Sequence, residues 1–211
     1  DGIYLYDEND KKYIDAVSSW GVNLHGHNHP YIKAAIQKQL NELDHVIFAG
    51  FTHPKAIELS ERLLKFVPGN YQKVFYSDDG STANEVALKM ALQYFIIKGE
   101  KRTKIIAFEN AYHGDTFGAM SLGGKNIFNA AFENWLIPEV IHIPVPLNGY
   151  SIEEWKKIEA LFTDEVATFI FEPLLQGSAG MMMYDAESLD RLIEIAERKG
   201  ILTIADEVLT D

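Results

Sequence analysis

The spacing of apolar residues divides most of the chain into short strands alternating with helices. Five short apolar, β-branched or aromatic runs predict buried strands at residues 73–77, 104–108, 140–145, 168–171 and 201–205. Between the first two runs, apolar residues recur three and four positions apart over residues 83–95, which predicts an amphipathic helix. We therefore expect an α/β fold, with a mainly parallel sheet covered by helices on both faces.

Two further helices in this part of the chain are predicted from their ends. The pattern Ser151-x-x-Glu154 is a capping box, in which each residue satisfies a backbone N–H at the start of a helix. A second helix should run from Ala186 to Lys199 and stop at Gly200, because glycine adopts the left-handed conformation that ends many helices.

The beginning of the chain has a different pattern. Short β-like runs at residues 3–6 and 12–16 flank the turn-forming tetrad at 7–10, which predicts a hairpin. Helices should then start at Pro30 and after His53-Pro54, since proline is favoured in the first turn of a helix. We expect a short N-terminal β segment before the α/β part.

Composition narrows the classes of function. Of the 211 residues, 47% are hydrophobic, which is enough for one sizeable core. The net charge of −12 disfavours nucleic acid and anionic membrane surfaces, so a small-molecule partner is expected. The absence of cysteine excludes disulfides and thiolate metal sites, and we expect a cytoplasmic protein. The first residues do not form a signal peptide, and the last predicted strand lies close to the end, so a longer protein is expected.

In parallel sheets, ligands bind where the strands end, and the sequence places suggestive residues there. The run at 73–77 is followed by Gly80 and Ser81, where a helix begins and its free N–H groups can bind a phosphate. The alternative is that Gly80 is only a turn residue and that Thr82 and Glu85 form only a capping box.

The other strand ends supply an aromatic ring and acids. Tyr112, beside His113, follows the run at 104–108 and could stack on a planar ligand, although a lone tyrosine is more often an ordinary half-buried loop residue. Glu172 and Asp206 follow two later runs. A carboxylate buried at a strand end needs a positive partner, and a protonated pyridine nitrogen would serve. A phosphate site, a stacking ring and the acid Asp206 together predict pyridoxal 5′-phosphate (PLP).

A histidine cluster and a methionine run are less informative about function. His25, His27 and His29 alternate along the chain and could ligate a metal. Without cysteine, and directly before Pro30, they more often form a polar loop that leads into a helix, and we adopt that interpretation. Residues 181–183, three consecutive methionines, are interpreted as packing or loop residues.

Four segments resemble the class III aminotransferases, and the resemblance extends over nearly the whole chain. They are Asp79-Gly80-Ser81-Thr82, Tyr112 to Ser121, Glu172-Pro173 and Ala205-Asp206-Glu207-Val208. The resemblance implies a fold-type-I PLP enzyme, normally a homodimer, that acts on a small amino donor and a keto acceptor. It also implies that residues 1–28 belong to a small domain and 29–211 to the first part of a large, PLP-binding domain.

The same resemblance implies roles for single residues. Gly80 and Ser81 would hold the phosphate, and Tyr112 would stack on the cofactor and contact the substrate. Asp206 would pair with the pyridine nitrogen, Val208 would pack on the opposite face of the ring, and Glu172 would lie near the cofactor. Trp20 would line the substrate pocket. The lysine that holds the cofactor covalently in the family lies beyond Asp211, and no lysine of this chain matches it.

Segments around Trp20, His27, Phe51 and Gly177 are most similar to a branch of the class that acts in biotin biosynthesis. That branch transfers the amino group of S-adenosylmethionine to 8-amino-7-oxononanoate, and some of its members use lysine as the donor. Gly21 departs from the branch, which often has a second aromatic residue there. The alternatives are another ω-aminotransferase, acting on GABA, ornithine or a diamine, and a non-catalytic phosphate-binding α/β protein.

Overall fold

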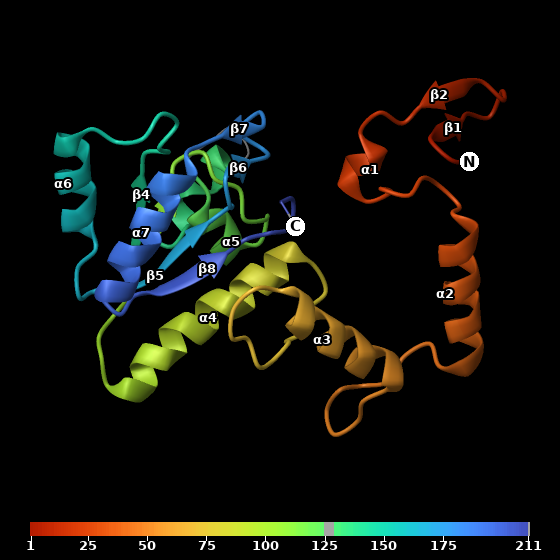
Figure 1. Ribbon diagram of the computed structural model, residues 1–211, viewed down its shortest axis with the longest axis horizontal. Coiled ribbons are helices and arrows are strands. Elements are labelled where there is room, and N and C mark those ends of the chain that lie inside the picture. Colours follow the sequence, from red (N-terminus) through yellow and green to blue (C-terminus); the bar gives the residue numbers. More distant parts are fainter. Residues whose placement is uncertain (125–128, 211) are drawn as a thin grey trace. The chain divides into compact units, whose positions relative to one another are not determined.

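The computed structural model describes residues 1–124 and 129–210, and the chain divides into two compact units, Asp1–Phe75 and Tyr76–Asp211 (Figure 1). This division falls well after residue 28, where the sequence suggested a domain boundary. The assignment of residues 1–28 to a small domain stays a prediction, because a compact unit of the chain is not the same as a domain of the whole protein.

The first unit opens with the predicted hairpin. Strands β1 (Tyr4–Tyr6) and β2 (Lys12–Ile14) pair antiparallel, with Tyr4 opposite Ile14. Asp7 stabilises the turn between them, since its Oδ1 accepts the backbone N–H groups of Asn9 at 2.9 Å and Lys11 at 3.0 Å. These hydrogen bonds explain why the turn-forming tetrad at residues 7–10 correctly predicted a hairpin.

Three helical segments complete the first unit: α1 (Ser18–Gly21), α2 (Pro30–Glu42) and α3 (Pro54–Phe66). Helices α2 and α3 begin at the two predicted prolines, and none of their residues is buried. The α1 turn is unexpected, because Ser18, Ser19 and Trp20 all have positive φ angles of 50°, 49° and 68°. Non-glycine residues seldom adopt this left-handed conformation, so sequence patterns do not predict it.

The second unit contains the parallel sheet. Its strands are β3 (Lys104–Phe108), β4 (Val140–Ile143), β5 (Val166–Phe171) and β8 (Leu202–Ala205), in the order β4-β3-β5-β8. All three pairings are parallel, with Ile106 opposite Phe169 and Phe169 opposite Thr203. Four of the five predicted strands are therefore confirmed, each close to its expected bounds, but Thr203 and Ala205 of β8 are exposed, so this strand is not buried as predicted.

The fifth prediction, a strand at residues 73–77, is wrong. No strand is assigned there, and none of the described residues forms a ladder with this segment. Apolar composition can suit a buried strand, but a strand also requires a partner whose backbone groups it can bond. The local pattern therefore could not establish this element by itself.

Helices connect the strands and lie on both faces of the sheet (Figure 1). They are α4 (Gly80–Lys98), α5 (Phe117–Leu122), α6 (Ile152–Leu161) and α7 (Ala186–Arg198). The predicted capping box of α6 is present, with Ser151 Oγ accepting the N–H of Glu154 at 3.3 Å. Helix α7 ends directly before Lys199 and Gly200, as expected.

Alternate side chains of the two central strands, β3 and β5, supply two hydrophobic cores. Ile106, Phe108 and Phe169 point into a core shared with α6 and α7. Ile105, Ala107 and Ile170 belong to the opposite core, which includes residues of α4 and α5. Because successive strand residues point to opposite faces, a strand covered on both sides is expected to be almost wholly apolar, and the uniformly buried β5 is apolar except at Thr168.

Besides α1 and α5, three shorter elements were not predicted: the 3₁₀ helix η1 (Ala130–Trp135) and the antiparallel pair β6 (Leu175–Gln176) and β7 (Met182–Met183). Two-residue strands are too short to show periodicity in sequence. The methionine run lies in and beside β7, and the side chains of Met181 and Met183 are exposed. Among the described residues, no helix combines the length and apolarity needed to cross a membrane.

The sheet core predicts a large effect for Ile170→Ala. Ile170 is fully buried, so the truncation should lower the free energy of unfolding by about 2–5 kcal/mol. The matched control is Ile152→Ala, because Ile152 is 77% exposed and should lose less than about 0.5 kcal/mol. Urea unfolding measures both changes, and equal losses in the two variants would contradict the assigned core.

Candidate active site

The ends of three neighbouring strands bring acidic and ring-bearing residues to one edge of the sheet. Because β3, β5 and β8 are parallel, the segments that follow them, at Glu109, Glu172 and Asp206, emerge at the same edge. The N-terminus of α4 contacts this edge through side chains of its first two turns. The predicted location of the site, where strands end and a helix begins, is therefore the place where these groups meet.

Asp206 is buried and held by two side chains. Its Oδ2 accepts a hydrogen bond from Asn84 Nδ2 at 2.8 Å and lies 2.7 Å from Nδ1 of His113. Burial raises the pKa of Asp206, but the hydrogen bond and charge of His113, with the Asn84 hydrogen bond, outweigh it, and the pKa is lowered. Asp206 is thus an ionised carboxylate, and His113 Nδ1 donates the proton of their shared hydrogen bond.

His113 and Asn84 form a small buried network around this acid. Asn84 Nδ2 also donates to the backbone carbonyl of His113 at 2.9 Å, so one amide group bridges the loop and the carboxylate. The side chain of His113 is fully buried, and its Nε2 has no partner among the described residues. The network fixes the carboxylate in one orientation, because both donors reach the same oxygen.

Glu172 is a second buried acid, with a different role. Its Oε1 accepts the N–H of Tyr112 and its Oε2 accepts the N–H of Gly177, each at 3.1 Å. Burial raises the pKa of Glu172 above its ordinary value, although these two N–H groups act in the opposite direction. Its carboxylate therefore joins the loop after β3 to the loop after β5.

The N-terminal cap of α4 is formed by other residues than the sequence suggested. The helix begins at Gly80, with Asp79 as N-cap, and Asp79 and Thr82 form the capping box. A capping box of Thr82 and Glu85 is therefore wrong, since Thr82 already occupies the third position of the helix. By helix geometry, the N–H groups of Gly80 and Ser81 have no partner within the helix and are free for an anion.

Close backbone approach explains the glycines near this helix. A Cβ at Gly80 would lie 2.8 Å from Cγ2 of Val208, so the start of α4 and the segment after β8 are in contact. A Cβ at Gly114 would lie 2.7 Å from Cα of Ser81, and Gly114 has a φ of +126°. Ser81 Oγ also accepts the N–H of Asp115 at 3.2 Å. Gly80, Ser81 and Val208, all predicted site residues, thus lie beside one another or beside the loop of residues 112–116, the Tyr112 loop.

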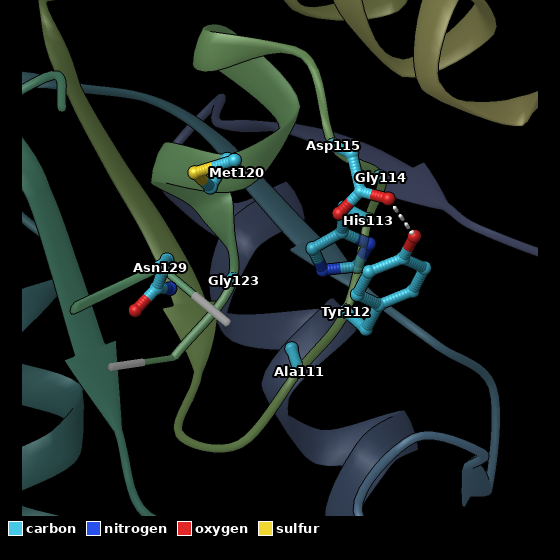
Figure 2. A pocket seen from close by; sticks show the side chains of 8 residues that line it. All are labelled: Ala111, Tyr112, His113, Gly114, Asp115, Met120, Gly123 and Asn129. Carbon is cyan, nitrogen blue, oxygen red and sulfur yellow. Dashed lines mark hydrogen bonds between the residues drawn. The ribbon is translucent and has the colours of Figure 1, made fainter. Parts of the chain in front are cut away.

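Tyr112 lies on the loop that these contacts hold. Its side chain is partly exposed, and its hydroxyl donates to Asp115 Oδ2 at 3.0 Å (Figure 2). A cavity of about 10 Å³ beside it is lined by Ala111, Tyr112, His113, Gly114, Asp115, Met120, Gly123 and Asn129. That volume suits a single water molecule and not a cofactor. Of the residues expected to bind a cofactor, Tyr112 alone lines this cavity.

Trp20 and the histidine cluster belong to the first unit. The side chain of Trp20 is 89% exposed, and its place in a substrate pocket stays a prediction. His27 Nε2 lies 2.8 Å from Asp15 Oδ2, and the rings of His25 and His29 meet edge to face. No group of three potential metal ligands converges in residues 1–124 or 129–210.

The sequence did not reveal the roles of Asn84, Glu85 and His113. Asn84 lies four residues after Gly80, and Glu85 lies four residues after Ser81. Residues four apart share one face of a helix, so both could have been assigned to the face that carries the anion site. His113 was recognised as neighbouring the site, but nothing in its local pattern indicated a contact with a residue 93 positions later.

Comparison with known proteins decides the family. The family model for class III aminotransferases matches residues 1–211. The chain belongs to the class III aminotransferases. A curated relative from Synechococcus elongatus, named adenosylmethionine-8-amino-7-oxononanoate aminotransferase, is 47% identical over 209 residues, which cover 95% of this chain and 49% of the relative. A Helicobacter pylori protein of the same name is 38% identical, with 99% and 49% covered.

Solved structures of this aminotransferase class have the same fold. The Methanocaldococcus jannaschii adenosylmethionine-8-amino-7-oxononanoate aminotransferase superposes with a TM-score of 0.92 and 37% identity, covering 100% of this chain and 48% of that one. A PLP-bound amine transaminase from an uncultivated Pseudomonas species gives 0.89 and 34%, covering 100% and 51%. The predicted family and fold class are confirmed. The chain spans about half the length of the curated relatives it matches.

The contact at Gly114 predicts that Gly114→Ala is more damaging than an ordinary glycine substitution. The control is Gly180→Ala, since Gly180 also has a positive φ, +84°, but open space around its Cα. Both variants place alanine in an unfavourable conformation, but only Gly114→Ala also drives a Cβ against Ser81. We expect its free energy of unfolding to fall by about 1–3 kcal/mol more than that of the control. Equal losses in urea unfolding would contradict this close approach.

The lowered pKa of Asp206 predicts a pH-dependent contribution to stability. A folded pKa below the unfolded value means that the carboxylate stabilises the fold above pH 3.8, and that this contribution is lost as pH falls through the folded pKa. The stability difference between wild type and Asp206→Asn should therefore be largest near neutral pH and shrink below 3.8. Urea unfolding over this range tests it, with the exposed Asp164→Asn as control. A difference that grows with acidity would contradict the assignment.

Proposed function

We propose that the whole protein containing this chain is an aminotransferase of biotin biosynthesis that transfers the amino group of S-adenosylmethionine to 8-amino-7-oxononanoate. The named relatives in Synechococcus elongatus and Helicobacter pylori support this substrate pair. Pyridoxal 5′-phosphate is the cofactor of the family to which the chain belongs. The observation that carries the proposal is the ionised, buried Asp206, fixed beside the N-terminus of α4.

The described residues have the chemistry that PLP requires. The free N–H groups of Gly80 and Ser81 suit the phosphate, and the glycine at position 80 allows the close contact with Val208. The carboxylate of Asp206 suits a protonated pyridine nitrogen. One of its oxygens, Oδ1, accepts only a 3.2 Å hydrogen bond from the N–H of Val208 among the described residues, which leaves capacity for a further donor.

The protein would use these residues to keep the cofactor reactive. When bound, PLP withdraws electrons from the substrate carbon that loses a proton. Asp206 would stabilise the proton on the ring nitrogen, because an ionised carboxylate favours a positive partner. His113 and Asn84 would hold that carboxylate in place, and Tyr112 would cover one face of the ring, with Val208 on the other. Trp20 and Tyr112 would contact the substrates.

The remaining predictions concern the activity of this chain by itself, and the assembly and location of the whole protein. Residues 1–211 alone should not turn over, because the lysine that serves the family as Schiff-base partner and proton carrier matches no residue of this chain. We also retain the predicted homodimer and the cytoplasmic location as parts of the proposal.

A second candidate is an ω-aminotransferase for another amine. The 34% identity and TM-score of 0.89 to the Pseudomonas amine transaminase favour this alternative, as does Gly21 in place of an aromatic residue. Both candidates use the same cofactor residues, so only substrates separate them. A non-catalytic phosphate-binding protein is not supported, because the family model covers the whole chain.

The test uses the whole protein, wild type and Asp206→Asn, with Asp164→Asn as the matched surface control. PLP binding is followed by visible absorption, and amino transfer to 8-amino-7-oxononanoate by mass spectrometry, with S-adenosylmethionine or lysine as donor. We expect wild type and control to be active, and Asp206→Asn to lose at least about 100-fold in kcat, since the ring proton loses its partner.

Three results would contradict parts of this proposal. A wild-type protein that does not bind PLP would contradict the cofactor assignment. Full activity of Asp206→Asn would contradict the role of the carboxylate. Faster amino transfer from GABA, ornithine or another amine to a 2-oxo acid than from S-adenosylmethionine or lysine to 8-amino-7-oxononanoate would support the ω-aminotransferase alternative.

A further inference from the structure

Glu85 makes a set of contacts that the proposed function does not yet use. It lies in the second turn of α4, and its Oε1 accepts three hydrogen bonds from the last residue of the Tyr112 loop and the first turn of α5. The donors are Thr116 Oγ1 at 2.6 Å, Gly118 N at 2.8 Å and Ala119 N at 3.1 Å. Hydrogen bonds to an ionised group are among the stronger ones in proteins, so this is a firm attachment.

These contacts replace the cap that α5 lacks. The N-cap position of α5 is Thr116, whose side chain makes no capping hydrogen bond within its own segment. An N-cap side chain normally accepts the N–H of the second or third helical residue, which here are Gly118 and Ala119. Glu85 accepts both, so a carboxylate from α4 caps α5 across a separation of more than 30 residues.

Gly118 provides the space for this carboxylate. A Cβ at position 118 would lie 2.3 Å from Oε2 and 2.5 Å from Oε1 of Glu85. Any larger residue would therefore displace the carboxylate and break the cap. Gly118 has no positive φ, so the approach of Glu85, and not backbone conformation, explains the glycine.

The same face of α4 holds the Tyr112 loop at two further points. Ser81 Oγ accepts the N–H of Asp115, and Asn84 Nδ2 donates to the carbonyl of His113. Glu85 holds the downstream end of this loop, and Glu172 holds its upstream end at the N–H of Tyr112. The ring of Tyr112 is thus carried by a segment that is anchored on both sides.

We propose that Glu85 is a positioning residue, which fixes the loop of residues 112–116 so that the Tyr112 ring is placed for the cofactor. This inference rests on the proposed function. Without the Glu85 carboxylate the first turn of α5 loses its cap, and the loop before it loses its downstream anchor. Glu85 itself acts through this loop and touches neither cofactor nor substrate.

The test compares Glu85→Ala, Glu85→Gln, Gly118→Ala and the double variant in the whole protein. Glu153→Ala and Glu153→Gln are matched controls, because Glu153 is an exposed helical glutamate. The first measurement is amide hydrogen exchange without PLP. The amides of residues 112–119 should lose protection in Glu85→Ala and Gly118→Ala, whereas the strand amides of β3 and β5 should not.

The second measurement is PLP affinity, with the visible circular dichroism of the bound cofactor. We expect Glu85→Ala to raise the Kd for PLP about tenfold, the order of effect of losing one hydrogen bond to a charged group. Glu85→Gln should retain most of the affinity, because its amide oxygen can still accept. The double variant should be no weaker than either single variant, since Gly118→Ala already displaces the carboxylate.

The outcomes separate the two proposals. If wild-type protein does not bind PLP, the proposed function fails. If wild type and Glu85→Ala bind PLP with Kd values within twofold and the same circular dichroism, the positioning role of Glu85 fails. Unchanged exchange of residues 112–119, or additive effects in the double variant, would also overturn it. A uniform loss of protection throughout the second unit would show a structural role only and would overturn it too.

Discussion

The candidate site depends on one buried carboxylate remaining charged. A lone ionised acid is costly inside a protein, and a neutral one would be the usual outcome of burial. Asp206 avoids that outcome because His113 and Asn84 both donate to its Oδ2, and their contribution exceeds the cost of desolvation. The fold therefore brings two hydrogen-bond donors, Asn84 and His113, from distant parts of the chain to one oxygen of Asp206.

Helix α4 is the element that connects this requirement to the rest of the site. Its first residues leave free N–H groups, its next turn supplies Asn84 to Asp206, and Glu85 follows to cap α5. These three sets of groups lie within six residues, Gly80 to Glu85. They can act on the same side of the helix, because residues three and four apart share one face. A shift of this face would disturb the proposed phosphate site, the acid and the Tyr112 loop together.

The sequence predicted what local patterns determine. Strands β3 and β5 were predictable because burial on both faces makes them almost continuously apolar, β4 and β8 because of their short apolar or β-branched runs, and the capping residue Ser151 marked the start of α6. The segment at 73–77 has a similar pattern, but a strand needs a partner that no local pattern supplies. Tyr112 and Asp206 were predicted from their places after strands, and Gly80 and Ser81 from the start of a helix, whereas the contacts of His113 and Glu85 depend on tertiary packing.

The two buried acids of the site can be distinguished by their hydrogen bonds. Each oxygen of Glu172 accepts a backbone N–H, from Tyr112 and from Gly177, and burial raises its pKa. Asp206 has a lowered pKa and an oxygen with remaining capacity. A positive ring nitrogen needs a carboxylate oxygen that can accept a further hydrogen bond, and a lowered pKa favours the charged form, so both properties favour Asp206 as its proposed partner. Glu172 is then a residue that joins two loops, which explains why a carboxylate near the site need not contact the cofactor.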